Sequence, residues 1–282
     1  MTVKIIDGKK IASHIKNEIN KEVNNLESKY GIFPNITTIK IGSNPESDLY
    51  LRLRDKACSA VGINSNHKEY SNKVTQENIL KEISKLNKDS NVNGILIQLP
   101  LPSHISQDVL INALDPKKDV EGMHPINLGN TLLGNELIVP CTPLAVLTIL
   151  ESEKTKLEGK DIAIINHSNI VGKPLTALFL NRNATVSVCH VFTKDMAKFT
   201  KNADILVTAA GVSKLIKSKH VKKGAFVIDV GIVSTKNGIT GDVDFEQVKK
   251  IAGKITPVPG GVGPVTIASS LKNMIKTTKN CI

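Results

Sequence analysis

Short strand-like runs alternate with helical segments through the second half of this chain. The runs are mostly apolar and lie at 162–165, 185–188, 205–208 and 226–229. Helical patterns at 171–181 and 194–202 follow the first two runs. Short apolar runs of this kind are typical of parallel strands that are buried on both faces. The alternation predicts a doubly wound α/β fold, whose ligand lies beyond the carboxyl ends of its strands.

The first half of the chain has the same elements in a different order. Helical patterns are expected over 9–29, 46–61 and 75–87, with strands over 37–41 and 94–99. Pro100 and Pro102 stop the second of these strands, because proline cannot donate to a sheet. Further along, Thr142 is expected to cap a helix that has Pro143 at its first position.

Two α/β domains are therefore expected. Residues 122–140 are interpreted as the connection between them, and the last helical pattern, 266–279, is expected to pack back on the N-terminal half. The predicted first domain is residues 1–139, completed by the C-terminal helix 266–282. The predicted second domain is a Rossmann-like parallel sheet at 140–265.

The composition agrees with an enzyme of two domains. Of 282 residues, 40% are hydrophobic and 22% charged. The N-terminal segment lacks the apolar block of a signal peptide, and no apolar run approaches the roughly 20 residues of a membrane span. We therefore expect a cytoplasmic protein that does not enter a membrane. The four cysteines are scattered and form no CxxC or Cys/His cluster, so neither a metal site nor a disulfide framework is predicted.

The formal net charge of +11 raises the question of nucleic-acid binding. Lysines are spread along polar helix faces among acidic residues, tryptophan is absent and aromatic residues are only 3%, so stacking platforms for single strands are few. We therefore expect no nucleic-acid partner. The positive field could attract a small polyanion, or the lysines could simply be solvated.

The segment 255–266 concentrates three glycines and three prolines just before the last helical pattern. Proline fixes φ and removes donors, whereas glycine permits positive φ and lets the backbone approach a ligand. The segment is interpreted either as a rigid wall with exposed backbone or as a tight reversal ahead of the helix.

Residues 166–174 connect the first strand of the second half to its helix, which is the position of a dinucleotide in this kind of fold. A helix N-terminus there offers unpaired N–H groups to a pyrophosphate, and Gly172 permits close packing. The usual G-x-G-x-x-G is absent, so an ordinary capped turn is the alternative.

Several motifs occur in one order along essentially the whole chain. They are Tyr50 with a basic residue at 54, Gly94–Pro102 (GILIQLPLP), Pro116–Gly122 (PKKDVEG), Pro140–Pro143 (PCTP), Ser168–Pro174 (SNIVGKP), Asp229–Ile232 (DVGI) and Pro257–Pro264 (PVPGGVGP). The ordered set resembles the bifunctional methylenetetrahydrofolate dehydrogenase/methenyltetrahydrofolate cyclohydrolase family.

The resemblance implies an N-terminal domain that binds a tetrahydrofolate derivative, an NADP-binding domain and a homodimer. It implies that hydride leaves the methylene carbon for the nicotinamide, and that water then attacks the methenyl carbon to give 10-formyltetrahydrofolate. In the family pattern, the position of Arg54 is a lysine that acts on the water and the substrate nitrogen with the help of Gln98. Tyr50 packs on the pterin, and the position of Glu121 is an aspartate that binds it.

The folate-binding residues implied in this way include several beyond the catalytic group of Tyr50, Arg54, Gln98 and Glu121. They are Leu99, Pro100, Asp119, Gly260, Gly261, Val262 and Pro264. An amide such as Gln98 would be unusual in a core and suits a pterin or a water molecule. Asp119 binds substrate or merely caps the following turn.

This chain departs from the family pattern at both charged positions, Arg54 and Glu121. A guanidinium donates hydrogen bonds but cannot cycle a proton as a desolvated lysine can, so the hydrolysis should suffer most. Lys56 points roughly 200° away from Arg54 on a helix and is expected to be solvated. Arg54 and Glu121 could instead form a bidentate clamp. A dehydrogenase-only enzyme and a folate- or NADP-binding protein with little turnover remain alternatives.

The expected cofactor is NADP, with NAD as the alternative. The family often has Gly-Arg-Ser where this chain has Asn166, His167 and Ser168, and that arginine holds the 2′-phosphate. His167 is a partial substitute, helped by Thr193 and Lys194, and no acidic residue follows the strand to claim a free 2′-hydroxyl. The remaining expected cofactor residues are Thr142, Ile170, Val171, Val191, Gly231 and Ile232.

Overall fold

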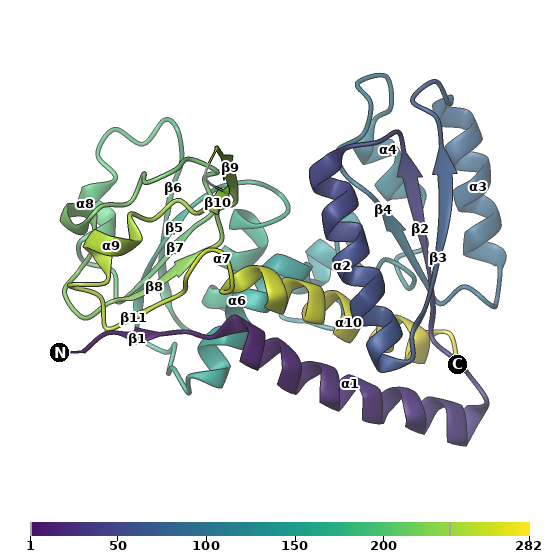
Figure 1. Cartoon of the computed structure of the whole chain (residues 1–282), viewed down its shortest axis with the longest axis horizontal. Helices are drawn as coiled ribbons and strands as arrows, with labels where there is room; N and C mark the ends of the chain where they lie inside the picture. Colours follow the sequence, from purple (N-terminus) through teal and green to yellow (C-terminus); the bar gives the residue numbers. More distant parts are fainter. Residues whose placement is uncertain (1, 237) are drawn as a thin grey trace. The chain divides into compact units, whose positions relative to one another are not determined.

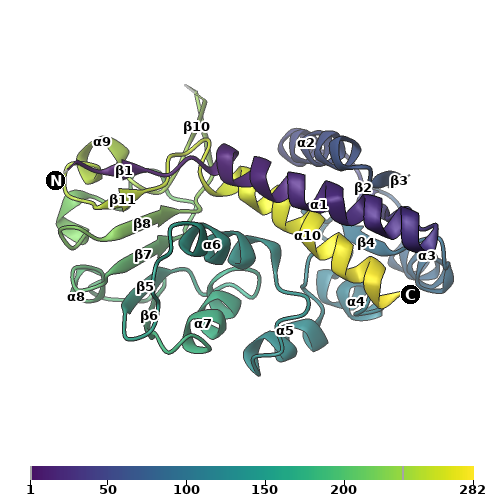
Figure 2. The ribbon, with the colours of Figure 1, turned by 90° about the horizontal axis from the view of Figure 1, so that it is seen from below.

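Two parallel β-sheets organise the chain (Figures 1 and 2). The computed structural model describes residues 2–236 and 238–282, with all of their side chains except that of Glu46. A six-stranded unit contains the described residues up to Ala12, residues 131–135 and residues 142–266. A three-stranded unit contains the rest of the described chain: 13–130, 136–141 and 267–282.

The three-stranded unit has the strand order β3-β2-β4, with every strand pair parallel. Its elements are β2 (Asn35–Ile41), α2 (Pro45–Val61), β3 (Asn64–Tyr70), α3 (Gln76–Lys88), β4 (Gly94–Ile97), α4 (Gln107–Ala113) and most of α5 (Pro125–Leu132), α1 (Gly8–Tyr30) and α10 (Val262–Asn280). Figure 1 shows α2 on one face of the sheet and α3 on the other. Isoleucines of β2, α3 and β4 form the core beneath α3, among them Ile39, Ile83 and Ile95.

The last helix joins this unit as expected. The part of α10 that belongs to the three-stranded unit lies beside α1, and Lys279 donates to Glu22 at 2.6 Å (Figure 2). Deeper in the unit, a Cβ added at Gly94 would lie only 2.6 Å from the sulfur of Met274. This close contact between α10 and β4 explains why a glycine opens that strand.

The six-stranded unit has the strand order β1-β11-β8-β7-β5-β6, again with parallel pairs throughout. Its elements are β1 (Lys4–Ile5), α6 (Cys141–Ser152), β5 (Asp161–Ile165), α7 (Gly172–Leu180), β6 (Thr185–Cys189), α8 (Ala197–Thr200), β7 (Ile205–Thr208), the 3₁₀ turn η1 (Ser218–His220), β8 (Phe226–Asp229), the hairpin β9 (Val233–Thr235) and β10 (Gly238–Thr240), α9 (Phe245–Val248) and β11 (Lys254–Ile255). Figure 1 shows α8 and α9 on one side of the sheet and α6 and α7 on the other. This is the doubly wound arrangement that the apolar runs predicted.

Several elements differ from the sequence prediction. The helix that Thr142 was expected to cap already begins at Cys141, and α10 begins at Val262 rather than at 266. Both helices carry a proline in the first turn. Backbone N–H groups there have no partner within the helix, so proline is tolerated at several first-turn positions and does not mark the first residue of the helix. The expected connection at 122–140 contains the helix α5.

The expected helix at 194–202 shrinks to the single turn of α8. His190 and Thr193 close a turn on each other, with the N–H of His190 donating to Thr193 Oγ1 at 2.9 Å and the N–H of Thr193 donating to the carbonyl of His190 at 2.8 Å. Asp195 then accepts the N–H of Ala197 at 3.1 Å. These local polar bonds compete with the helix and delay its start.

Strand β3 has no counterpart among the predicted elements, because its sequence NSNHKEY has almost no apolar positions. It forms the edge of its sheet and pairs with β2 along its whole length, from Asn35 opposite Asn64 to Ile41 opposite Tyr70. None of the helices in the described part of the chain is long and apolar enough to cross a membrane.

Candidate active site and cofactor site

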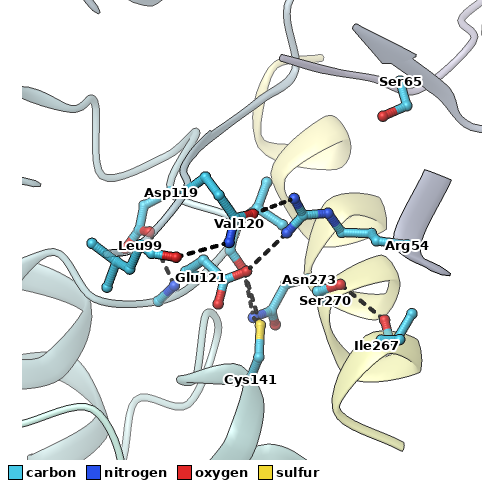
Figure 3. A network of polar contacts seen from close by, with 12 residues as sticks. Arg54, Ser65, Leu99, Asp119, Val120, Glu121, Cys141, Ile267, Ser270 and Asn273 are labelled. Atoms are coloured by element: carbon cyan, nitrogen blue, oxygen red, sulfur yellow. Dashed lines mark hydrogen bonds and ion pairs between the residues drawn. The ribbon is translucent and has the colours of Figure 1, made fainter. Parts of the chain in front are cut away.

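A buried arginine organises the polar cluster of the three-stranded unit (Figure 3). Arg54, on α2, is 1% exposed. Its Nη2 donates to Oε1 of Gln98 at 3.3 Å, and its Nη1 lies 3.6 Å from Oε1 of Glu121. Its Nε is buried and has no partner among the described residues. The guanidinium is thus held by two of the residues that the sequence singled out, and the contact with Glu121 is a single long ion pair rather than a bidentate clamp.

Tyr50 lies one helical turn before Arg54, and the guanidinium carbon is 5.8 Å from the centre of its ring. Burial and the negative charge of Glu121 raise the pKa of the Tyr50 phenol, so the ring stays neutral. Lys56, which the helical spacing directed away from Arg54, is exposed. The structure therefore offers no lysine from this helix in place of the arginine.

Gln98 follows directly after β4, and both ends of its amide are occupied. Its Oε1 accepts from Arg54, and its Nε2 donates to the carbonyl of Leu99 at 3.1 Å. The peptide bond between Leu99 and Pro100 is cis. The end of the strand thus places the amide beside the arginine with both of its polar atoms bonded, and a contact of Gln98 with a pterin or a water molecule stays a prediction.

Glu121 is the acidic partner in this cluster, with a side chain 24% exposed. Burial raises the pKa of its carboxyl group, the positive charge of Arg54 opposes this, and Asp119 adds to the rise. Cys141 lies beside it, and burial together with the charge of Glu121 raises the pKa of that thiol well above its ordinary value. The thiol is therefore neutral and donates to the carbonyl of Val120 at 3.4 Å.

Asp119 is buried, and its carboxylate is fully used by the turn that follows. Its Oδ1 accepts the N–H of Gly122 at 3.0 Å, and its Oδ2 accepts from the N–H of His124 at 2.8 Å and from the Asn127 amide at 2.9 Å. This geometry favours the capping role that the sequence left open. Asp119 fixes the segment that carries Glu121.

Sequence reasoning missed Asn273, which lies on α10 and is fully buried. Its Nδ2 donates to the carbonyls of Val120 at 3.0 Å and Val139 at 2.8 Å, so it links two segments beside Glu121. Its Oδ1 has no partner among the described residues. The only available signal was an asparagine at a position where the helical pattern calls for an apolar residue.

The segment rich in proline and glycine lies in the six-stranded unit, between β11 and α10. The carbonyl of Gly260 accepts the N–H of Gly8 at 3.0 Å, and a Cβ at Gly8 would overlap the carbonyl of Gly261. Gly260 has a φ of +102°, which only glycine adopts readily. Part of this backbone therefore packs against the start of α1, whereas Pro259 is exposed. Val262 and Pro264 belong to the first turn of α10.

The loop after β5 is shaped by Asn166. Its Oδ1 accepts from the N–H of Ser168 at 2.8 Å, from the Ser168 hydroxyl at 2.8 Å and from the N–H of Gly172 at 3.0 Å. Its Nδ2 donates to the carbonyl of Ala209 at 2.7 Å, which joins this loop to the one after β7. Adjacent strands β7 and β5 mark the point where the chain changes direction across the sheet, the usual place for a ligand.

The expected unpaired N–H groups at the start of α7 are in part occupied. Gly172 donates to Asn166, and Val171 donates to the hydroxyl of Ser168 at 3.2 Å. The N–H groups of His167, Asn169 and Ile170 make no hydrogen bond to another described residue. An anion bound at this loop would therefore contact the N–H groups of the turn before α7 rather than those of the first residues of α7.

The loop after β6 carries Val191, Thr193 and Lys194. Val191 is 86% exposed, and Lys194 is also exposed. The Thr193 hydroxyl accepts from His190 and also bonds the thiol of Cys189, so it is already engaged. Thr193 and Lys194 were both expected to recognise a phosphate in this loop, and of these two the Lys194 side chain remains available.

Gly231 and Ile232 follow β8, next to two buried aspartates: Asp229, which opens the DVGI motif, and Asp242, which the sequence analysis did not single out. Asp229 accepts from the N–H of Gly231 at 3.0 Å, and Asp242 accepts from the N–H groups of Ala210 and Val212 at 2.6 and 2.8 Å. A Cβ at Gly231 would overlap the carboxylate of Asp242. Ile232 is 63% exposed. Thr142, the last expected cofactor residue, lies partly exposed in the first turn of α6.

The role of Asn166 can be tested directly. Asn166→Ala should lower the free energy of unfolding by about 1–2 kcal/mol, as the loss of a helix cap does, and should weaken dinucleotide binding because the loop loses its shape. Asn166→Asp keeps the acceptor for the loop N–H groups but sets a carboxylate against the Ala209 carbonyl and an expected pyrophosphate, so it should not restore dinucleotide binding. Urea unfolding and a dinucleotide titration measure both quantities. Equal stability of Asn166→Ala and the parent would contradict the prediction.

Comparisons with known proteins agree along the whole chain. Residues 6–121 match the family model "Tetrahydrofolate dehydrogenase/cyclohydrolase, catalytic domain", and residues 140–282 match its "NAD(P)-binding domain". The chain is 50% identical to the Bifunctional protein FolD of Methanosarcina barkeri over 272 residues, covering 96% of this chain and 95% of that protein. It is 48% identical to the FolD protein of Methanococcoides burtonii, covering 98% and 96%.

Solved structures give the same result. The bifunctional FolD methylenetetrahydrofolate dehydrogenase/cyclohydrolase of Campylobacter jejuni superposes with a TM-score of 0.97 at 46% identity, covering 99% of this chain and 100% of that one. The Trypanosoma brucei enzyme, solved with NADP and an inhibitor, superposes with a TM-score of 0.94 at 38% identity, covering 99% and 98%. This chain therefore belongs to the tetrahydrofolate dehydrogenase/cyclohydrolase family.

Proposed function

We propose that this chain catalyses the NADP-dependent oxidation of 5,10-methylenetetrahydrofolate to 5,10-methenyltetrahydrofolate and the hydrolysis of that product to 10-formyltetrahydrofolate. The observation that carries the proposal is the cluster of Tyr50, Arg54, Gln98 and Glu121, which brings the family's motif positions together around one buried guanidinium. Membership of the family and the names of its FolD relatives support both steps.

In the oxidation, the chain positions the substrate. The neutral Tyr50 ring supplies a flat surface for the pterin, and the Glu121 carboxylate accepts hydrogen bonds from its N–H groups. Arg54 and Gln98 lie beside the carbon–nitrogen group that reacts. NADP, when bound, accepts the hydride. Because this step needs positioning more than proton transfer, the arginine does not impede it.

In the hydrolysis, a water molecule adds to the methenyl carbon and loses a proton to the solvent, and one of the two carbon–nitrogen bonds then breaks as its nitrogen takes up a proton. Arg54 cannot accept the proton that the water loses, because an arginine guanidinium stays protonated throughout the working pH range of proteins. It can only orient the water through Gln98 and stabilise negative charge. We therefore infer that hydrolysis is the slower of the two steps, and that an enzyme limited to oxidation is the alternative that Arg54 favours.

The pH dependence of folate binding follows from Glu121. Its pKa is raised above the ordinary 4.5, so the carboxylate is lost at a higher pH than in an exposed glutamate. KM for the folate should therefore rise as pH falls, beginning above pH 4.5. Glu121→Gln should raise KM at neutral pH and remove that dependence. If KM rises at low pH in the Glu121→Gln variant just as it does in the parent, Glu121 is not the source of that pH dependence.

The cofactor proposal rests on the chain's own loops. The free N–H groups of Asn169 and Ile170 suit a pyrophosphate, and no acidic side chain lies at the end of β6 to favour NAD. We assign the folate to the unit of Arg54 and NADP to the six-stranded unit. A homodimer in the cytoplasm completes the proposal, and light scattering after gel filtration tests the dimer.

The function is tested on the purified protein with two separate assays. NADP-dependent oxidation of methylenetetrahydrofolate is followed by formation of NADPH, and hydrolysis is followed by loss of added methenyltetrahydrofolate. We expect clear oxidation and hydrolysis that is slower. Binding of NADP and folate without any turnover would instead support a binding protein of the same fold.

A further inference from the structure

A cavity lies at the amino end of the six-stranded sheet, where the strands begin. Its volume is about 310 Å³, and Ile205, Phe226 and Lys254, the first residues of β7, β8 and β11, line one part of it. These strand starts lie side by side, because Phe226 pairs with both Ile205 and Lys254. The dinucleotide loops follow the carboxyl ends of the same parallel sheet. The cavity is therefore separate from the candidate cofactor site.

Lysines dominate the wall of this cavity. Among the described residues, it is lined by five lysines and two acidic residues. The lysines are Lys154, Lys160, Lys222, Lys223 and Lys254, and the acidic residues are Glu153 and Asp204. Five positive charges against two negative ones leave the wall with an excess of three positive charges.

Both acidic residues are already paired. Asp204 accepts from Nζ of Lys222 at 2.7 Å, and this hydrogen bond lowers the pKa of its carboxyl group. Glu153 accepts from Nζ of Lys4 at 2.7 Å and lies 3.0 Å from Nζ of Lys254. Burial alone would raise the pKa of Glu153, but these two lysines lower it. Both groups are therefore carboxylates at neutral pH, and their charge is used within the wall.

Lys154, Lys160 and Lys223 are the cations left over. Their side chains make no ion pair and no hydrogen bond to another described residue. The backbone N–H groups of Lys222 and Lys223 also make no hydrogen bond within the described chain. Unpaired positive charges around one cavity repel each other. An anion in the cavity would relieve that repulsion and would also gain donors.

The strand starts give this cavity an apolar part. Phe226 and Ile205 are buried, and Nζ of Lys254 lies 5.4 Å from the centre of the Phe226 ring. That distance is within the range of a cation–π contact, which holds the lysine against the ring. The volume is at the lower end of the range for small-molecule sites. The cavity thus combines positive charge with an apolar surface, as a site for a small organic anion does.

We propose that this cavity binds a small molecule that carries a diphosphate group. Such a group has roughly three negative charges at neutral pH, which matches the excess positive charge of the wall. Lysine suits it, because an ammonium group is a compact charge with three donors and a common ligand of phosphate. Inorganic pyrophosphate and a nucleoside diphosphate share this chemistry. The site is independent of the folate reaction assigned to this chain.

Calorimetric titration of the whole chain with inorganic pyrophosphate, at neutral pH and without divalent metal ions, tests the site. We expect a saturable site that persists when NADP is added, and binding at least about tenfold tighter than that of orthophosphate, because the second phosphate adds charge-assisted hydrogen bonds. ADP should bind at least as tightly as pyrophosphate; a clear gain would identify a nucleoside diphosphate as the better ligand. Lys154→Gln and Lys223→Gln should each weaken pyrophosphate about tenfold.

A matched control separates this cavity from the overall charge of the protein. Lys81→Gln with Lys88→Gln removes two exposed lysines of α3 in the three-stranded unit, and it should bind pyrophosphate as the parent does. Lys154→Gln with Lys223→Gln removes the same charge and should weaken binding about a hundredfold. All four lysines are exposed, so little stability depends on them, and thermal melting checks that each variant is folded.

Four results would overturn the proposal. Pyrophosphate that does not bind, or that binds no more tightly than orthophosphate, excludes recognition of a diphosphate. Pyrophosphate that NADP displaces completely lies in the dinucleotide loop instead. Equal weakening in the α3 control and in the cavity variant would mean that the anion responds only to net charge.

Discussion

Replacing Arg54 by lysine and Glu121 by aspartate together should raise the rate of methenyltetrahydrofolate hydrolysis by at least about 10²-fold, the usual contribution of general acid–base catalysis. A desolvated lysine can exchange its proton with water, whereas the guanidinium that now lies between Gln98 and Glu121 only holds charge. The rate of oxidation should change by less than about tenfold, because that step depends on positioning.

The two changes belong together because the residues are in contact. The two side chains are 3.6 Å apart, and the family pattern pairs the lysine with an aspartate, so a single reversion leaves one residue of each kind opposite the other. We expect Arg54→Lys alone to recover only part of the hydrolysis. Lys56→Ala is the matched control, since that exposed lysine on the same helix should affect neither step. Stopped-flow absorbance of the methenyl compound measures the hydrolysis.

Native hydrolysis as fast as oxidation, with no gain in the double variant, would contradict this expectation. It would mean that Arg54 supports the second step by orienting water and stabilising charge alone. Hydrolysis restored from an undetectable level would instead identify the natural protein as a dehydrogenase that has lost its second activity.

The second large effect concerns stability. Glu121→Leu should lower the free energy of unfolding by about 3 kcal/mol, because it leaves the charge of Arg54 buried without a carboxylate. The arginine is 1% exposed, and its remaining side-chain hydrogen bond to Gln98 is to a neutral amide. Urea-induced unfolding, followed by circular dichroism, measures the change.

A double variant distinguishes an unpaired charge from simple loss of packing. Arg54→Met combined with Glu121→Leu removes both charges and keeps apolar volume, so it should be more stable than Glu121→Leu alone. If the double variant is the less stable of the two, the cost arises from packing, and the ion pair contributes little. Both variants should lack activity, which makes stability the readout.

The local pattern of apolar residues predicted most of the helices and strands. The helices α1 and α3 and the strands β2, β7 and β8 lie within a residue or two of their expected bounds. Their apolar periodicity is a property of neighbouring residues, so it is visible without the fold. The ordered motifs also carried the family, because their order and spacing are properties of the sequence alone.

The local pattern did not predict the polar strand β3 or the side chains that cap turns. β3 is made of polar residues and is a strand only because β2 supplies its hydrogen bonds. Asn166 was expected as a cofactor residue, yet its side chain is occupied by its own loop and by Ala209. Asp119 is likewise engaged by the turn after it. Such bonds depend on where distant backbone groups come to lie.

The sequence by itself determined two α/β units, their parallel sheets and the residue types at the reactive positions, since these follow from short-range periodicity and from motifs. Only the tertiary structure decided which charges meet. Arg54 and Glu121 come from two separate segments of the chain, and Asn273, from a third, holds the backbone beside Glu121. Burial and distance set the strength of a charge interaction, and both arise only when the segments pack.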